Sequence, residues 1–176
     1  NSNYFNSQDY ENYFYKYHNY KFEMLTKFVL ATNNLTSAFP NLNFVVRPHP
    51  DESISSWKNM LIPKKNLLIT KEYSHSDWIE NSEITIHNGC MGGIEAFARE
   101  KNIICYKPIE SDVEMDLPND MSLKVKNLSE LKDIIKDHFD KKKNIEIKNR
   151  NEMSKKLIYR FGDFYSQSFC NNILNE

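Results

Sequence analysis

Three of the four glycines of the chain lie within five residues, in the segment His87-Asn88-Gly89-Cys90-Met91-Gly92-Gly93. Glycine adopts positive φ angles and lets a ligand approach the main chain closely. A helix that begins here would present free N–H groups, which together with the helix dipole bind anions. The turn therefore predicts an anion site and favours a phosphate. Close packing of a strand against a helix also demands small residues, so that alternative stays open.

The turn lacks the features of two common nucleotide-binding motifs. No Gly-Lys-Ser/Thr sequence follows it, as it would in a P-loop, and its glycine spacing differs from the GxGxxG pattern of dinucleotide-binding proteins. A kinase or a dehydrogenase is therefore disfavoured.

A second polar motif, Arg47-Pro48-His49-Pro50, combines a cation and a titratable imidazole with two prolines that stiffen the chain around the histidine. Rigid placement of an imidazole suits contact with a phosphate or a leaving group, and His49 and Arg47 are the candidate catalytic residues. A proline-rich strand exit with a capping histidine is an equally good interpretation of the motif. Arg47 would then pair with a structural acid.

Three further features near the turn have both a functional and a structural interpretation. Glu95 could reach a ribose hydroxyl pair or simply complement the helix dipole. The acidic loop 110–116 leads to Leu117-Pro118-Asn119, which could contact a sugar or base or remain solvated. Cys90 has no base or orienting residue close to it in sequence, which favours a small buried thiol over a nucleophile.

Composition excludes several classes of function. The chain has 176 residues and a formal charge of −1, so it fits one ordinary domain without a global field that would attract nucleic acid or an anionic membrane. Its three cysteines and five histidines show no disulfide or zinc spacing, and His18, His75 and His138 are interpreted as surface or satisfied side chains. No apolar run of about 20 residues and no signal peptide are visible, which favours a cytoplasmic protein. Because the sequence begins with Asn1, we expect a fragment of a longer protein.

The elements that must position these motifs follow from apolar periodicity, which predicts a long helix over 10–38 and a closing helix over 153–174. Between them strands and helices alternate, which is typical of a parallel sheet covered by helices. The predicted strands are 43–47, 66–70, 83–87, 103–106 and 121–125, and the predicted helices are 53–60, 76–81, 92–100 and 129–139. The expected organisation is a helical segment over 1–40, an α/β Rossmann-like domain over 41–140 with about five strands, and a linker and helix over 141–176.

Ligands of open parallel sheets bind outside the carboxyl ends of the strands. Both polar motifs follow predicted strands, so we expect them to converge at one edge of the sheet.

The ordered series of motifs resembles a known family. Arg47-Pro48-His49-Pro50 with Asp51, Glu52 and Trp57 is followed by Asp77-Trp78-Ile79, Ile86-His87-Asn88-Gly89-Cys90, Ile94-Glu95-Ala96, Tyr106-Lys107-Pro108 and Leu117-Pro118-Asn119. Over about residues 43–120 this series resembles bacterial surface carbohydrate biosynthesis proteins. These are similar to the GT-B glycosyltransferases of capsule and lipopolysaccharide assembly, including the Kdo transferases. Sialyltransferases and CDP-glycerol glycerophosphotransferases are more distantly similar.

The resemblance implies the C-terminal, nucleotide-sugar-binding half of a GT-B enzyme with a CMP-linked donor. His49 would contact the donor phosphate, the turn from Gly89 to Gly93 would supply N–H groups, Glu95 would approach the ribose, and His87 would line the site. Where relatives tend to carry hydroxyl residues, this chain has Met91 and Gly92, so the turn offers backbone donors only. The donor-binding set is His87, Asn88, Gly89, Cys90, Gly92, Gly93, Glu95, Pro118 and Asn119.

The expected activity is inverting glycosyl transfer from a nucleotide sugar to a glycan or lipid-linked acceptor, in the cytoplasm or at the inner face of the membrane. It needs neither a cofactor nor a metal, because no carboxylate cluster of the metal-ligand type accompanies the phosphate site. The resemblance also implies an N-terminal GT-B domain outside this sequence. Alternatives are a nucleotide-binding module without catalysis, a CDP-glycerol glycerophosphotransferase and a sugar-nucleotide epimerase on the same scaffold.

Overall fold

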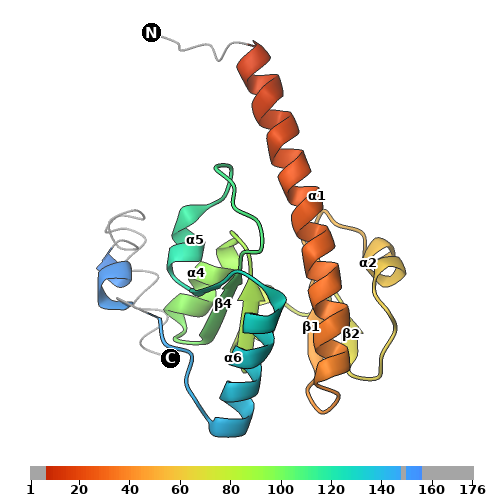
Figure 1. Ribbon diagram of the computed structural model, residues 1–176, viewed down its shortest axis with the longest axis vertical. Helices are drawn as coiled ribbons and strands as arrows, with labels where there is room; N and C mark the ends of the chain where they lie inside the picture. Colours follow the sequence, from red (N-terminus) through yellow and green to blue (C-terminus); the bar gives the residue numbers. More distant parts are fainter. Residues whose placement is uncertain (1–6, 148–149, 156–176) are drawn as a thin grey trace. The chain divides into compact units, whose positions relative to one another are not determined.

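The computed structural model describes residues 7–147 and 150–155, which form two compact units (Figure 1). The first unit comprises the chain up to Ser74 together with Pro108–Glu114. The second comprises His75–Lys107 and the chain from Met115 onward. Both units draw on the region 41–140 that the sequence assigns to one Rossmann-like domain.

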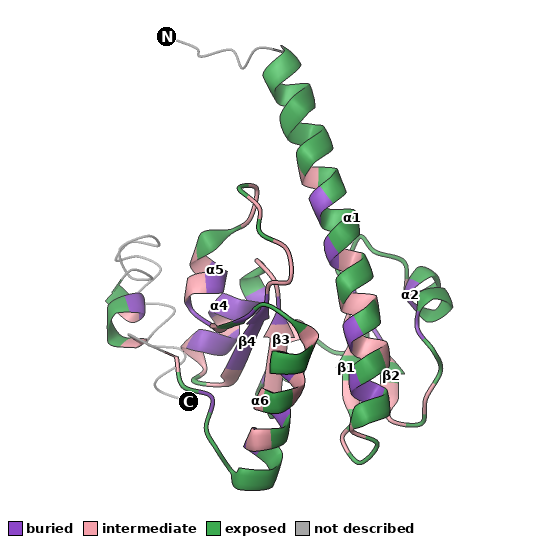
Figure 2. Ribbon diagram, in the orientation of Figure 1, coloured by how far each residue is buried: buried purple, intermediate pink, exposed green. Residues whose placement is uncertain are grey.

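The first unit consists of α1 (Ser7–Ala38), β1 (Phe44–Val46), α2 (Ile54–Met60) and β2 (Leu67–Ile69), with β1 and β2 paired in parallel. Helix α1 buries one stripe of side chains along its C-terminal part, whereas its N-terminal part is almost wholly exposed (Figure 2). The stripe follows helical spacing and comprises Tyr20, Met24, Ala31 and Leu35. The Asn66 amide donates to the carbonyls of Thr36, Phe39 and Leu42, which fastens the end of α1 to the start of β2.

The second unit contains a three-stranded parallel sheet in the order β3-β4-β5. In chain order its elements are α3 (His75–Glu80), β3 (Ile84–His87), α4 (Met91–Ala98), β4 (Asn102–Tyr106), α5 (Asp116–Asp120), β5 (Leu123–Val125) and α6 (Leu128–Lys141). The central strand β4 is the most deeply buried, with Ile103, Ile104 and Cys105 each 0% exposed. Helix α4 packs on β3 and β4 and carries the apolar side chains Ile94 and Phe97 into the core.

The predicted elements are present in their expected order, with one addition. The expected acidic loop is without helix over 110–115, but its last residue and the Leu117-Pro118-Asn119 segment after it form α5 at Asp116–Asp120. Pro118 is compatible with this helix because it lies in the first turn, where a missing N–H costs no hydrogen bond. The edge strand predicted at 121–125 is confirmed as β5, whereas most of the predicted helix 153–174 lies outside the described residues.

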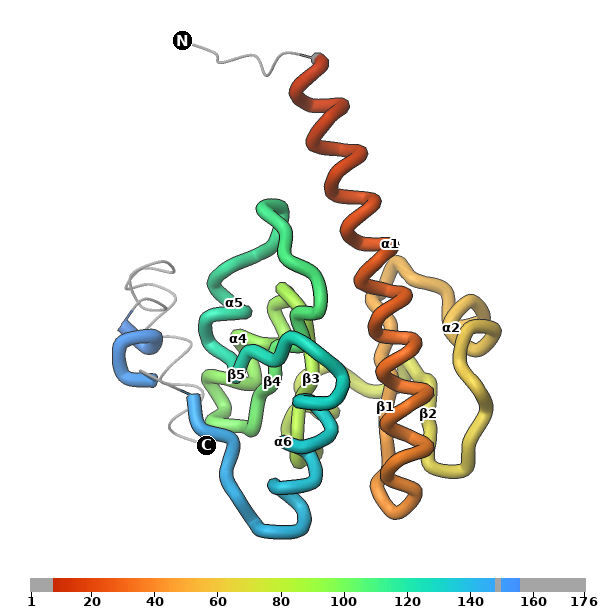
Figure 3. The backbone as a smooth tube through the Cα atoms, viewed as in Figure 1, coloured from red at the N-terminus to blue at the C-terminus, as the bar shows by residue number. Residues whose placement is uncertain are grey.

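The expected single sheet of about five strands is wrong, because β1 pairs only with β2 and the other three strands form a sheet of their own. The expectation that both polar motifs follow strands of one sheet fails for the same reason. Arg47-Pro48-His49-Pro50 follows β1 in the first unit, and the glycine turn follows β3 in the second. A long loop joins β4 to α5 and contains the seven residues that return to the first unit (Figure 3).

Candidate functional site

The turn between β3 and α4 has a main chain held in place by α5. Gly89 has a φ of +54°, a conformation that glycine adopts at little cost. Its N–H donates to Asn119 Oδ1 at 2.7 Å, and the buried Asn119 oxygen also accepts from Cys105 Sγ at 3.1 Å. The Asn88 amide donates to the Tyr106 carbonyl at the end of β4. The path of the turn is therefore fixed by groups on β4 and α5.

The N-terminus of α4 is exposed and lacks a side-chain cap. Cys90 is the N-cap residue and makes no capping hydrogen bond through its side chain. The N–H of Gly93 donates to the Cys90 carbonyl, and the first amides of a helix have no acceptor within it. Met91 is exposed, whereas Gly92 is buried, so the Met91 N–H is the donor that this surface offers to an anion.

His87 lies beneath this turn as a buried, neutral side chain. It is 5% exposed, and burial lowers its pKa to about 4. Its Nε2 lies 2.7 Å from Ser122 Oγ, and that hydroxyl donates to the Pro118 carbonyl, so His87 Nε2–H is the donor of the pair. Nδ1 then carries a lone pair and has no hydrogen-bond partner among the described residues. A neutral ring in this tautomer cannot donate to a phosphate through Nδ1.

Glu95 is already engaged by side chains of its own unit. The Ser76 hydroxyl and His75 Nδ1 donate to its carboxylate, the latter at 3.1 Å, and Arg99 Nε lies 3.5 Å away. Burial alone would raise the pKa of Glu95, but the hydrogen bonds from Ser76 and His75 outweigh it and the pKa is lowered. The carboxylate therefore stays ionised and links α3 to α4.

The structure thus gathers the predicted donor-binding residues in the second unit, around the β3–α4 turn. Five of them are buried, namely His87, Gly92, Gly93, Pro118 and Asn119. Asn119 supports the turn by accepting from the Gly89 N–H. His75 and Ser76 also belong to this cluster, although the sequence did not place them there. They lie some 20 residues before Glu95, a separation that no local spacing rule detects.

The Arg47–Pro50 motif forms a well-held loop of the first unit. Pro48 is fully buried, whereas the His49 ring is exposed and its Nδ1 accepts from the Asp51 N–H. The N–H of His49 donates to Glu52 Oε2, and the Lys71 ammonium donates to the carbonyls of Pro50 and Glu52.

Arg47 Nη2 donates to the Tyr73 carbonyl, and Arg47 Nε is buried without a hydrogen-bond partner among the described residues. Within the described part of the chain, no carboxylate pairs with this guanidinium in the way that a purely structural ion pair would require.

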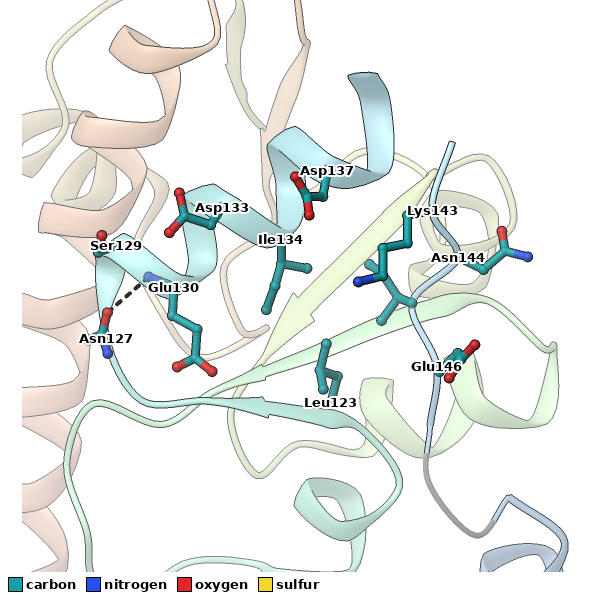
Figure 4. A pocket seen from close by; sticks show the side chains of 11 residues that line it. Leu123, Asn127, Ser129, Glu130, Asp133, Ile134, Asp137, Lys143, Asn144 and Glu146 are labelled. Atoms are coloured by element: carbon teal, nitrogen blue, oxygen red, sulfur yellow. Dashed lines mark hydrogen bonds between the residues drawn. The ribbon is translucent and has the colours of Figure 1, made fainter. Parts of the chain in front are cut away.

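A separate groove of about 560 Å³ lies beside α6 (Figure 4). Carboxylates on α6 and the segment that follows dominate its polar lining, with Lys143 as a cation. The groove contains none of the predicted site residues, and its walls are Leu123, Asn127, Ser129, Glu130, Asp133, Ile134, Asp137, Lys143, Asn144, Ile145 and Glu146. Its negative charge disfavours a phosphate, so the glycine turn remains the better anion site.

Over residues 7–147 and 150–155, no group of three or more acidic, histidine or cysteine side chains could hold a metal ion. No helix in this part of the chain has the length and apolar character needed to cross a membrane. No protein-family model, curated protein or solved structure matches the chain.

Proposed function

We propose that the turn at the N-terminus of α4 binds the phosphate of a nucleotide-activated sugar, CMP-linked, and that the protein serves glycosyl transfer in surface polysaccharide assembly. The observation that supports this proposal is the N–H of the exposed Met91, at a helix N-terminus without a side-chain cap and on a rigid turn. The nucleotide and the reaction come from the resemblance to the donor half of GT-B glycosyltransferases.

The rigidity of the turn matters for such a reaction. When a sugar leaves a nucleotide, negative charge develops on the phosphate, and donors that are already in position stabilise it without reorganising. Asn119 holds the Gly89 N–H and so fixes the turn before any ligand arrives. In this proposal Glu95 and His87 support the turn, whereas backbone N–H groups contact the phosphate.

The assignment of His49 and Arg47 to the transfer step stays a prediction from the sequence. The loop that carries them belongs to the first unit and is fixed by Glu52 and Lys71. Binding by the second unit can be tested without these two residues.

The sharpest test removes a single N–H donor. Met91→Pro deletes the Met91 N–H at the first position of α4, where helices accept proline. Cys90 before it already has the extended conformation that proline requires, with φ −118° and ψ 158°. We expect the affinity for CMP, measured by calorimetry, to fall by about tenfold or more, as for the loss of a hydrogen bond to a charged group.

The matched control is Met91→Ala, which keeps the N–H and should bind CMP like the unmodified chain. Equal affinities of the proline and alanine variants would show that the phosphate does not contact this amide. Failure of CMP, CDP and CMP-sugars to bind at millimolar concentration would overturn the cytidine assignment altogether.

A second candidate function is nucleotide binding without catalysis. The turn carries Met91 and Gly92 and therefore offers only backbone donors, which suffices for binding. Product analysis with CMP-sugar, UDP-sugar and CDP-glycerol donors separates these possibilities. Transferred sugar supports the transferase, transferred glycerol phosphate or an epimerised donor supports the other enzymes, and binding without any product supports the module.

A further inference from the structure

The exposure of three polar side chains in the second unit decreases from the surface inward, in the order Cys90, His75 and Glu95. Cys90 is exposed at the N-cap of α4, the His75 side chain is 43% exposed at the start of α3, and the Glu95 side chain is 24% exposed. A nucleophile, a base and a residue that orients the base have this order in many enzymes.

The contact between His75 and Glu95 fixes which nitrogen of the ring carries the proton. Glu95 Oε2 lies 3.1 Å from His75 Nδ1, and an ionised carboxylate can only accept a hydrogen bond. Nδ1 is therefore protonated, and in the neutral ring Nε2 carries the lone pair. Burial raises the pKa of Glu95, but the hydrogen bonds from Ser76 and His75 lower it by more. The pKa is therefore lowered and the carboxylate stays ionised.

The basic nitrogen and the thiol border the same space above Gly92. A Cβ atom added to Gly92 would lie 2.6 Å from His75 Nε2, 2.4 Å from His75 Cε1 and 3.4 Å from Cys90 Sγ. Only a residue without a side chain lets the ring come this close to the N-terminus of α4. A base and a thiol facing one small space is the arrangement that proton transfer between them requires.

We propose that Cys90 is a nucleophilic thiol, with His75 as its general base and Glu95 as the positioning residue, and that it reacts with small-molecule disulfides. This inference does not require that a nucleotide binds, although Cys90 and Glu95 belong to the same turn and helix as the proposed phosphate site. Cys90 lies on an open surface, which suits a reagent that needs no enclosed pocket. The amide groups at the start of α4 add a favourable field for a thiolate.

In the proposed step His75 Nε2 takes the proton from Cys90 Sγ, and the thiolate attacks one sulfur of the disulfide. The sulfur–sulfur bond of the reagent breaks as a new one forms to Cys90, so Cys90 is oxidised to a mixed disulfide. The departing sulfur leaves as a thiolate and takes the proton from the His75 imidazolium. The disulfide reagent is thereby reduced to one free thiol.

Cys105 provides an internal comparison. It is 0% exposed in the central strand, and its thiol donates to Asn119 Oδ1. We expect it to remain unmodified while Cys90 reacts. Cys170 lies outside the described residues and is replaced by serine in every variant.

The test measures the rate of reaction of the full chain with oxidised glutathione and with an aromatic disulfide, and locates the adduct by peptide mass mapping. At pH 7 an ordinary thiol is only a few per cent ionised. Because His75 removes the proton during the attack, Cys90 should react about ten times faster than the thiol of free glutathione. His75→Gln should return the rate to that of the free thiol, and Glu95→Gln should shift the pH at which the rate rises.

His18→Gln, on the exposed part of α1, is the matched control and should leave the rate unchanged. A Cys90 rate equal to that of free glutathione, or an equal rate in a folded His75→Gln variant, overturns the proposal. If His75→Gln does not fold, the rate of Cys90 in the unmodified chain tests the proposal. A Cys90 rate about ten times that of free glutathione at pH 7 supports the proposal, and an equal rate overturns it.

Discussion

At the scale of single residues, the three glycines of the turn serve different purposes. Gly89 is needed for its positive φ, whereas Gly92 and Gly93 each leave room for a histidine ring. His75 covers Gly92 and His87 covers Gly93. The alternative of close packing, which the sequence left open, thus accounts for two of the three glycines.

The two ring contacts should respond differently to an added methyl group. In Gly93→Ala the Cβ would lie 2.3 Å from the ring of His87, which is buried and held by Ser122. We expect a loss of about 1–3 kcal/mol in the free energy of unfolding, measured with urea. Gly92→Ala is the control, because the half-exposed His75 ring can turn away and alanine favours the helix. Equal losses for both variants would contradict this account.

His87 also makes stability depend on pH. Its pKa is about 4 in the folded chain, because burial disfavours the charged ring, and about 6.5 when unfolded. The contribution of neutral His87 to the free energy of unfolding is complete above pH 6.5. It is lost as the pH falls toward 4, because between these pH values the histidine takes up a proton in the unfolded chain only. The loss reaches roughly 3 kcal/mol and does not grow below pH 4.

The measurement is the free energy of unfolding from pH 8 to pH 4 in the unmodified chain and in His87→Gln. Glutamine can still donate to Ser122 but does not titrate. The difference between the two chains should therefore change over this range by the predicted amount, whereas parallel curves would show that His87 takes up its proton as readily in the folded as in the unfolded chain.

At the scale of elements, α6 is the helix whose termini are best defined. Asn127 Oδ1 accepts from the Glu130 N–H at 2.9 Å, and Glu130 Oε2 accepts from the Lys126 N–H. Leu131 and Ile135 anchor the helix to the core of the second unit. The cap therefore fixes where a strongly amphipathic segment begins, at Leu128 and thus one residue before the predicted helix 129–139. Asn followed by Glu three residues later is the pattern that marks this start.

Asn127→Ala removes this cap and should cost about 1 kcal/mol of unfolding free energy. Ser53→Ala, at the N-cap of α2, is the comparison. Its hydroxyl accepts from the Ser56 N–H at the longer distance of 3.4 Å, so the loss should be smaller. Denaturant titration of both variants checks the order, and a larger loss for Ser53→Ala would refute it.

At the scale of the whole molecule, the order of elements could be predicted from sequence but their pairing could not. Alternation of apolar strands and helices looks the same whether the strands join one sheet or two, and strands such as Phe44–Val46 carry no signal of their partners. Helix α5 was missed because its acidic residues and Pro118 show no apolar period. The contact of His75 with Glu95 depends on how α3 packs against α4, which no local spacing records.

Protection from hydrogen exchange should be distributed unevenly over the chain. The amides of β4 are bonded between β3 and β5 and carry the most buried side chains, so we expect them to exchange most slowly. The exposed residues 8–16 of α1 should exchange fastest among the described helices. Mass spectrometry of exchanged peptides tests this order, and slow exchange over 8–16 would reveal a partner covering that part of α1.

The position of the segment Pro108–Glu114 in the sequence affects the order in which the two units are completed during synthesis. These residues belong to the first unit, and Asp112 pairs there with Lys16 of α1. During synthesis, units generally fold in the order in which they emerge from the ribosome. The first unit, however, cannot acquire its last segment until β3, α4 and β4 have already been translated. The unit that begins first is therefore completed only after much of the other has left the ribosome.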